Sequence, residues 1–130
     1  MSASRILIDT QAFIWMMNAS NRLSVAALHS ITLPNVQLCV SIATPWEMAI
    51  KVSIGKLRLG KPIQEIVEKY GTLLHFLPIQ AHHLAIVETL PLHHRDPFDR
   101  IIIAQAIAEN IPVVSSDAAF DDYSVQRIWE

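Results

Sequence analysis

Four carboxylates have the chemistry and the positions along the chain to share one metal site: Asp9, Glu47, Asp99 and Asp117. Each is expected where a strand gives way to a helix, or in the first turn of a helix. Because strands and helices are predicted to alternate, such positions gather at one edge of a sheet. Unit charges about 4 Å apart repel by about 4 kcal/mol, whereas a helix start offsets only about 0.3–1 kcal/mol per acid. If the four converge, the pocket needs a cation.

The types of side chain favour a hard divalent ion. All four candidates are oxygen donors, and no cysteine or histidine shares their spacing. That set indicates Mg²⁺ or Mn²⁺ rather than Zn²⁺. Carboxylate sites for such ions typically support in-line displacement at phosphorus, with an activated water as the nucleophile.

Basic residues close to the acids suit a polyanionic substrate. Four of the chain's ten basic residues fall in eleven positions just beyond Glu47, namely Lys51, Lys56, Arg58 and Lys61. Two more, Arg95 and Arg100, flank residues 96–99. We expect Lys51, Arg95 and Arg100 to contact the substrate, although an ordinary solvated turn would carry the same charges after Glu47.

Each acid also has a purely structural alternative, which is to cap a helix. The expected caps are Asp9 for the helix after it, Glu47 in a capping box with Thr44, Asp99 in the same relation to Asp96, and Asp117 for a short helical turn. Capping does not explain why all four positions fall at one predicted edge. It is also compatible with metal binding, because a helix N-terminus keeps a carboxylate ionised.

The hydrophobic pattern predicts an α/β fold. Buried strands are expected at residues 5–9, 36–42, 75–79, 113–115 and 125–129, with Pro78 confining the third to an edge or an end. Helices are expected at 10–18, 24–32, 44–55, 62–70, 80–89 and 96–110, and a helical turn at 118–121. This alternation predicts a mostly parallel sheet with helices on both faces, in one domain spanning residues 1–130.

Composition narrows the setting. The chain is 52% hydrophobic and only 17% charged, which indicates that some apolar surface is buried against another chain. A net charge of −2 excludes a broad basic field for nucleic acid but not an enzyme whose metal supplies positive charge locally. One cysteine, Cys39, no signal peptide and no membrane-spanning stretch together predict a cytoplasmic protein without a membrane partner.

The histidines and tryptophans carry weaker signals. His82-His83 and His93-His94 are adjacent pairs whose side chains are expected to point apart, without the i, i+4 spacing of a zinc helix. His94 is nevertheless near enough to Asp96 to touch substrate. The three tryptophans suit packing in the core or at an interface better than stacking on bases.

Several segments together resemble the PIN-domain family, and in particular its VapC-like toxins. They are Ile6-Leu7-Ile8-Asp9-Thr10, Trp46-Glu47-Met48-Ala49-Ile50-Lys51, His94-Arg95-Asp96-Pro97-Phe98-Asp99-Arg100, Ile103-Ala104-Gln105-Ala106, Ser115-Ser116-Asp117 and Ile128-Trp129. The resemblance implies a three-layer α/β/α sandwich with a five-stranded sheet, and a Mg²⁺- or Mn²⁺-dependent endoribonuclease that cuts RNA. It also implies a homodimer and inhibition by a cognate antitoxin protein.

By motif position, the resemblance assigns metal binding and catalysis to Asp9, Glu47, Asp99 and Asp117. It adds Asp96 as a possible further acid and gives Thr10 and Ser115 supporting roles. The sequence departs from the pattern at two positions: Gln11 stands where close relatives often carry His, and Ser115 where Thr is commoner.

Three other classes of protein were weighed. A receiver domain needs an Asp at the end of its third strand, where this chain has Ile79-Gln80-Ala81, and a haloacid-type phosphatase needs Asp-x-Asp where this chain has Asp9-Thr10-Gln11. The remaining alternative is a catalytically silent PIN-like module that binds RNA or a protein. The complete set of acids favours the enzyme.

Overall fold

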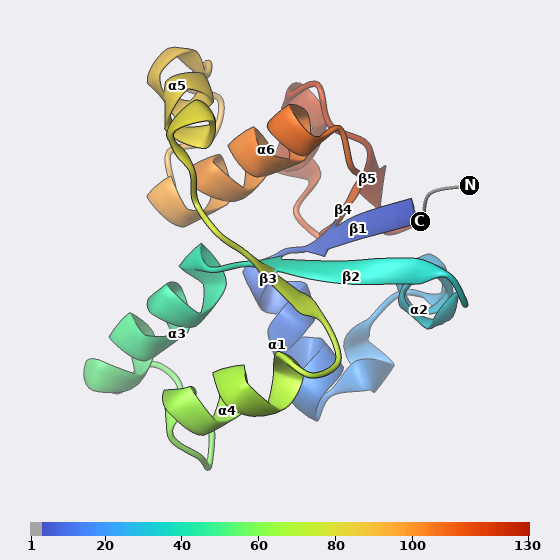
Figure 1. Cartoon of the computed structure of the whole chain (residues 1–130), viewed down its shortest axis with the longest axis vertical. Coiled ribbons are helices and arrows are strands. Elements are labelled where there is room, and N and C mark those ends of the chain that lie inside the picture. Colours follow the sequence, from blue (N-terminus) through green and yellow to red (C-terminus); the bar gives the residue numbers. More distant parts are fainter. Residues whose placement is uncertain (1–3) are drawn as a thin grey trace.

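The computed structural model describes residues 4–130, and within them the chain alternates between strands and helices (Figure 1). The strands are β1 (Ser4–Ile8), β2 (Val36–Ser41), β3 (His75–Leu77), β4 (Val113–Val114) and β5 (Arg127–Ile128). The α-helices are α1 (Thr10–Asn18), α2 (Val25–Thr32), α3 (Ala43–Ser53), α4 (Ile63–Tyr70), α5 (Ala81–Thr89) and α6 (Pro97–Glu109), and two short 3₁₀ helices are η1 (Ser20–Arg22) and η2 (Ala118–Asp122). Residues 1–3, which belong to the stretch expected to lack a signal peptide, lie outside the described range.

The sheet has the order β3-β2-β1-β4-β5, and every described pair of neighbouring strands is parallel. The central strand is β1, whose Ile8 is in register with Val40 of β2 on one side and Val114 of β4 on the other. The chain therefore builds outward from β1 in one direction and then returns to build in the other. Ligands of such sheets bind at the carboxyl ends of the strands, where the order reverses. In this chain that point lies between β1 and β4, directly after Ile8.

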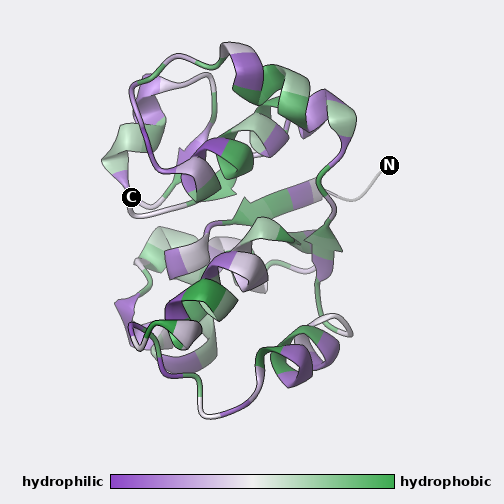
Figure 2. Cartoon of the chain, turned by 90° about the vertical axis from the view of Figure 1, so that its left-hand side faces the viewer, coloured by the Kyte–Doolittle hydropathy of each residue, from purple (hydrophilic) through white to green (hydrophobic). Residues whose placement is uncertain are grey.

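Alternate strand residues face two separate hydrophobic cores. Ile6 and Ile8 pack with Phe13 of α1 and Ile66 of α4 in one core, while Leu7 packs with α6 in the other. The sheet accordingly lies between α1–α4 and the pair α5 and α6, as Figure 1 shows. In Figure 2 the apolar strands run through the middle, and the helices around them mix apolar and hydrophilic residues. The three-layer α/β/α fold expected from the sequence is confirmed.

Most of the expected boundaries needed correction by one or two residues, and the 3₁₀ helix η1 was not expected. The third strand ends at Leu77, directly before Pro78, rather than at residue 79, and the last two strands have only two residues each. Helix α3 begins at Ala43 rather than Thr44, because the Ser41 hydroxyl accepts the Ala43 N–H at 3.1 Å. Within the described residues, no helix is both long and apolar enough to cross a bilayer.

Phe13 tests the account of the first core. Its ring is fully buried and meets Tyr70 and Phe76 edge-on, with ring centroids 5.5 and 6.2 Å away. Phe13→Ala should lower the free energy of unfolding by about 3–5 kcal/mol, measured by urea denaturation, because it leaves a cavity. The control is Leu73→Ala at a side chain that is 71% exposed, which should cost no more than about 0.5 kcal/mol. Equal losses in the two variants would contradict this packing.

Candidate metal centre

The four predicted acids line one hollow of about 190 Å³. It lies at the carboxyl ends of the strands, where Asp9 directly follows β1 and Asp117 lies just after β4. The full lining is Asp9, Thr10, Gln11, Ile14, Glu47, Lys51, Asp96, Asp99, Ser116 and Asp117. A larger hollow of about 470 Å³ lies beside Val36–Leu38 and residues 71–75, and none of these acids lines it. Chemistry rather than size therefore marks the smaller hollow as the candidate site.

Three of the acids that line the hollow also cap helices. Asp9 Oδ1 accepts the Ala12 N–H at 2.8 Å, and Asp117 Oδ1 accepts the Ala119 N–H at 2.9 Å. Asp96 caps α6, accepting the N–H groups of Phe98 and Asp99 at 2.8 and 3.1 Å. These contacts use one oxygen of each carboxylate. Helix capping and metal binding are therefore compatible, because each cap orients its acid and leaves the second carboxylate oxygen for other partners.

Glu47 is not part of the expected capping box. Thr44 instead shares a hydrogen bond of 2.9 Å with Thr10, so that the two hydroxyls join the starts of α1 and α3. Glu47 is only 7% exposed, and its Oε2 pairs with Lys51 Nζ at 2.9 Å. Its Oε1 is buried without a hydrogen-bond partner among the described residues.

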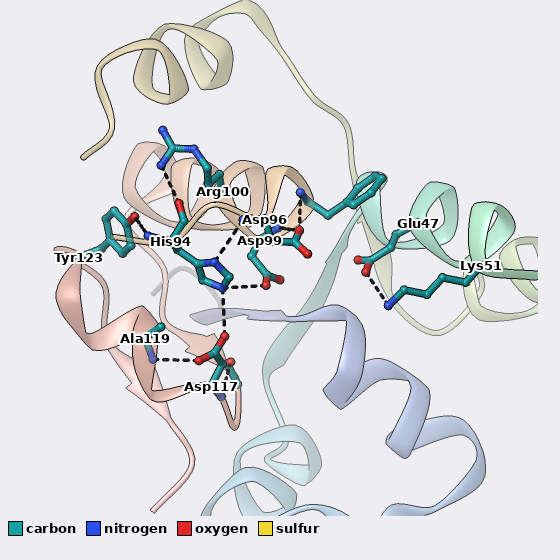
Figure 3. Close-up of polar contacts among 11 residues, drawn as sticks. Glu47, Lys51, His94, Asp96, Asp99, Arg100, Asp117, Ala119 and Tyr123 are labelled. Carbon is teal, nitrogen blue, oxygen red and sulfur yellow. Dashed lines mark hydrogen bonds and ion pairs between the residues drawn. The ribbon is translucent and has the colours of Figure 1, made fainter. Parts of the chain in front are cut away.

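That unpartnered oxygen is the test of whether a metal fits. A buried acceptor left without a donor costs about 1–3 kcal/mol, and more when it is charged. Figure 3 shows the Glu47 carboxylate on the side of its helix that faces Asp96 and Asp99. A hard divalent cation held among these oxygens would satisfy it, so the residues present fit Mg²⁺ or Mn²⁺.

Two of the acids resist ionisation without such a cation. Burial raises the pKa of Asp9 to about 6, and the negative charges of Asp117 and Glu47 add to the rise. Hydrogen bonds from Ser115 and Ala12 act in the opposite direction and lower the pKa of Asp9. Burial likewise raises the pKa of Asp99 to about 7, helped by Asp96 and opposed by His94. The hollow therefore carries less negative charge at neutral pH than its composition suggests, and a bound cation would favour full ionisation.

A histidine absent from the predicted ligand set lies at the centre of this cluster. His94 Nε2 is 2.9 Å from Asp99 Oδ2 and 3.0 Å from Asp117 Oδ2, and its ring bridges the two acids (Figure 3). From its place beside Arg95 and Asp96 in the sequence, His94 was expected only to touch substrate. Asp117 lies 23 residues further along the chain, and no local spacing signals such a contact.

The three basic residues expected to contact substrate differ in where they lie. Lys51 lines the hollow beside Glu47, and Arg95 is exposed next to His94. Arg100 is buried, and its guanidinium donates to the carbonyls of Val87, Leu90, Pro91 and His94 at 2.9–3.3 Å. Figure 3 shows it directed away from the acids, so the expected substrate contact of Arg100 is corrected to a structural role.

The two hydroxyl residues given supporting roles lie inside the site. Thr10 is buried and holds Thr44, as described above. Ser115 is also buried, and its Oγ accepts the Asp117 N–H at 3.0 Å. Gln11 is exposed at the edge of the hollow. The replacement of Thr by Ser at position 115 therefore keeps the hydroxyl in use.

A second cluster lies away from the hollow and corrects another expectation. The adjacent residues His82 and His83 do not point apart, since both Nε2 atoms approach Glu109 Oε2, at 3.2 and 3.1 Å. These hydrogen bonds, with a further one from Arg5, lower the pKa of Glu109 to about 2. His83 Nδ1 accepts the Gln80 N–H at 2.9 Å, which puts the ring proton on Nε2. That nitrogen donates to Glu109 and is not free to bind a metal.

Comparison with known proteins places the chain in a family. Residues 6–126 match the family described as PIN domain, and the chain belongs to it. No curated protein sequence gives a significant match.

Solved structures share the fold at low sequence identity. One is a DNA-bound VapBC from Salmonella typhimurium, at TM-score 0.72 and 14% identity over 95% of this chain and 96% of that one. VapBC2 from Rickettsia felis, bound to a promoter DNA fragment, gives 0.71 and 15% over the same shares. VapBC-1 from nontypeable Haemophilus influenzae gives 0.66 and 18%, again over 95% and 96%. The chain thus shares the fold of these structures, and that fold is the one that the sequence motifs indicated.

The raised pKa values predict how stability depends on pH in the metal-free protein. An acid whose pKa is higher folded than unfolded stabilises the fold below its unfolded value, 3.8 for Asp, and this contribution is lost as pH rises through about 6 for Asp9 and about 7 for Asp99. The lowered pKa of Glu109 acts with the opposite sign, but only below its ordinary value of 4.5. In EDTA, the free energy of unfolding should therefore fall between about pH 4.5 and pH 7.

Urea denaturation across that pH range measures the effect. Asp9→Asn keeps the helix cap but cannot ionise, so it should flatten the curve by about 1–3 kcal/mol, since one pKa unit corresponds to about 1.4 kcal/mol. Asp121→Asn is the control, because Asp121 is an exposed acid whose pKa is lowered by Arg127 and which titrates below this range. The same slope in wild type and Asp9→Asn would show that Asp9 ionises freely.

Proposed function

We propose that this chain is a Mg²⁺- or Mn²⁺-dependent endoribonuclease that acts as the toxin of a toxin–antitoxin pair. One observation carries the proposal: Asp9, Glu47, Asp99 and Asp117 line a single hollow in which, among the described residues, a buried Glu47 oxygen has no hydrogen-bond donor. Membership of the PIN-domain family supports the nuclease class. The fold shared with VapBC complexes supports an antitoxin partner.

The side chains divide the work of phosphodiester hydrolysis. Asp9, Glu47, Asp99 and Asp117 would hold the cation, with Asp96 beside them. When bound, the ion supplies charge neutralisation at the phosphoryl oxygens and makes water a better nucleophile at neutral pH. The water oxygen forms a new bond to phosphorus, one ester P–O bond breaks, and the proton lost by water balances the alkoxide that leaves.

Two basic side chains near the hollow are placed to pair with the phosphates of RNA. Lys51 lies among the lining residues with its ammonium against Glu47, and exposed Arg95 is next in the chain to His94. Thr10 contributes by joining the starts of α1 and α3 through Thr44, and Ser115 by holding Asp9 and Asp117, rather than by contacting RNA. The chain has a net charge of −2, so attraction of a polyanion must be local to this site.

The proposed antitoxin would silence the site by competing for the same carboxylates. A basic side chain pairs well with crowded acids, because charge-assisted hydrogen bonds are about twice as strong as neutral ones. Such a segment would block both the cation and the substrate. We place this activity in the cytoplasm, where Cys39, a buried thiol, would stay reduced.

A second copy of the chain would cover an exposed apolar surface on α3, α5 and α6. Trp46 and Leu84 are 60% and 56% exposed there and border an apolar hollow of about 230 Å³. The other residues lining it are Ile79, Val87, Pro97, Phe98 and Ile101. Contiguous apolar surface of this kind marks protein–protein contacts. We therefore propose a homodimer through this face.

The nuclease proposal predicts a metal requirement. With labelled RNA, the wild type should cleave in Mg²⁺ or Mn²⁺ and stop in EDTA. Asp9→Asn or Asp117→Asn should lower the cleavage rate by at least about 100-fold, since losing even an outer-sphere partner costs about 10–100-fold. Glu88→Gln, at an exposed acid of α5 that does not line the hollow, is the matched control and should cleave normally.

Cleavage that persists unchanged in EDTA would refute the metal-dependent mechanism. The silent-module alternative predicts a different result, in which the protein binds RNA in the presence of metal without any cut. Gel mobility and cleavage on the same RNA separate these outcomes.

The dimer proposal predicts the effect of one charge on the apolar face. The wild type should sediment as a dimer at micromolar concentration, and Leu84→Glu should shift it toward monomer because the new carboxylate would be buried without a partner. Leu73→Glu adds the same charge at a more exposed leucine outside that face and should leave the dimer intact. A monomeric wild type, or equal effects of the two variants, would contradict the proposed interface.

A further inference from the structure

His94 joins the last two acids of the site through one nitrogen. Its Nε2 lies 2.9 Å from Asp99 Oδ2 and 3.0 Å from Asp117 Oδ2, although these acids belong to different elements, α6 and the turn before η2. The contact with Asp117 has the geometry of a hydrogen bond, and the contact with Asp99 is a close polar contact of ion-pair length. The ring therefore fixes the separation between two like charges that would otherwise repel each other.

The other ring nitrogen determines where the proton is. His94 Nδ1 accepts the Asp96 N–H at 3.4 Å, so the neutral ring carries its proton on Nε2, facing the two carboxylates. In this tautomer Nε2 donates to the carboxylates and has no lone pair to offer a metal. His94 is thus suited to hold the acids from outside the cation's coordination sphere.

The backbone of His94 is fixed on both sides. Its N–H donates to the Tyr123 hydroxyl at 2.7 Å, and that hydroxyl in turn donates to the Pro91 carbonyl at 2.7 Å. Its carbonyl accepts from Arg100 Nη1 at 3.0 Å, which gives the buried guanidinium a purpose close to the site. The ring therefore has little freedom to swing away from Asp99 and Asp117.

Two carboxylate oxygens of the site take no part in these contacts. In the described part of the chain, no hydrogen bond uses Asp99 Oδ1, and Glu47 Oε1 is buried without a donor. We propose that His94 is a positioning residue of the metal site, whose Nε2 hydrogen-bonds to Asp117 and lies against Asp99, so that the remaining oxygens are arranged for a divalent cation. This inference rests on the proposed function and adds to it a fifth residue that controls cation affinity without binding the cation.

Mn²⁺ affinity, measured by titration calorimetry on the full chain, tests the proposal independently of RNA cleavage. His94→Ala should weaken Mn²⁺ binding by about 10–100-fold, the usual cost of losing a partner that orients a ligand. The matched pair is His94→Gln and His94→Asn. The Gln amide nitrogen is as many bonds from the backbone as His Nε2, so it should restore most of the affinity, whereas the Asn nitrogen is too short to reach. Tyr123→Phe should weaken binding in the same direction but by less.

The control is His82→Ala. His82 also contacts a carboxylate, that of Glu109, but outside this site, so its loss should leave the Mn²⁺ affinity unchanged. Thermal melting in EDTA verifies that each variant is folded. If His94→Ala does not fold, the comparison of the Gln and Asn variants decides. Equal affinities for those two, or tighter binding in any His94 variant, would overturn the positioning role. A wild type that binds no Mn²⁺ would instead refute the metal site itself.

Discussion

Repulsion among carboxylates at the carboxyl end of a parallel sheet is the constraint on which this structure depends. The reversal of strand order at β1 brings Asp9 and Asp117 together, and Glu47 of α3 and Asp99 in the first turn of α6 complete the same hollow. Two like charges about 4 Å apart cost about 4 kcal/mol at a surface-like dielectric. The chain must therefore offset this charge before it can use it.

The protein offsets part of the repulsion with its own groups. Helix N-termini donate to Asp9 and Asp117, Lys51 pairs with Glu47, and His94 bridges Asp99 to Asp117. Burial, with a smaller contribution from the repulsion that remains, raises the pKa values of Asp9 and Asp99, and among the described residues one buried Glu47 oxygen has no hydrogen-bond donor. A site satisfied only in part by its protein is prepared for a ligand of opposite charge. On this account, the carboxylates that destabilise the empty pocket are also the groups that would bind a cation. The proposed antitoxin would compete for the same carboxylates.

Much of this arrangement is readable from local sequence, and the rest depends on contacts between distant residues. Apolar runs that end in an acid predicted the edge of the sheet at which the four carboxylates meet, because strand direction is a local property. The capping box expected of Thr44 and Glu47 does not form, because Thr44 bonds to Thr10, which lies 34 residues away. The Arg100 guanidinium points away from the site because it donates to backbone carbonyls of the loop that precedes α6. The position of His94 depends on its contact with Asp117. Likewise, His82 and His83 converge because Glu109 lies across from both of them.

The most direct test of the central claim is to find the cation itself. Crystals soaked in Mn²⁺ and measured at the manganese absorption edge should give an anomalous peak inside the hollow, about 2.1 Å from oxygens that include Glu47 Oε1. His94 should remain within hydrogen-bonding distance of Asp99 and Asp117, outside the coordination sphere. A hollow without a peak, or a peak found only at His82, His83 and Glu109, would contradict the account.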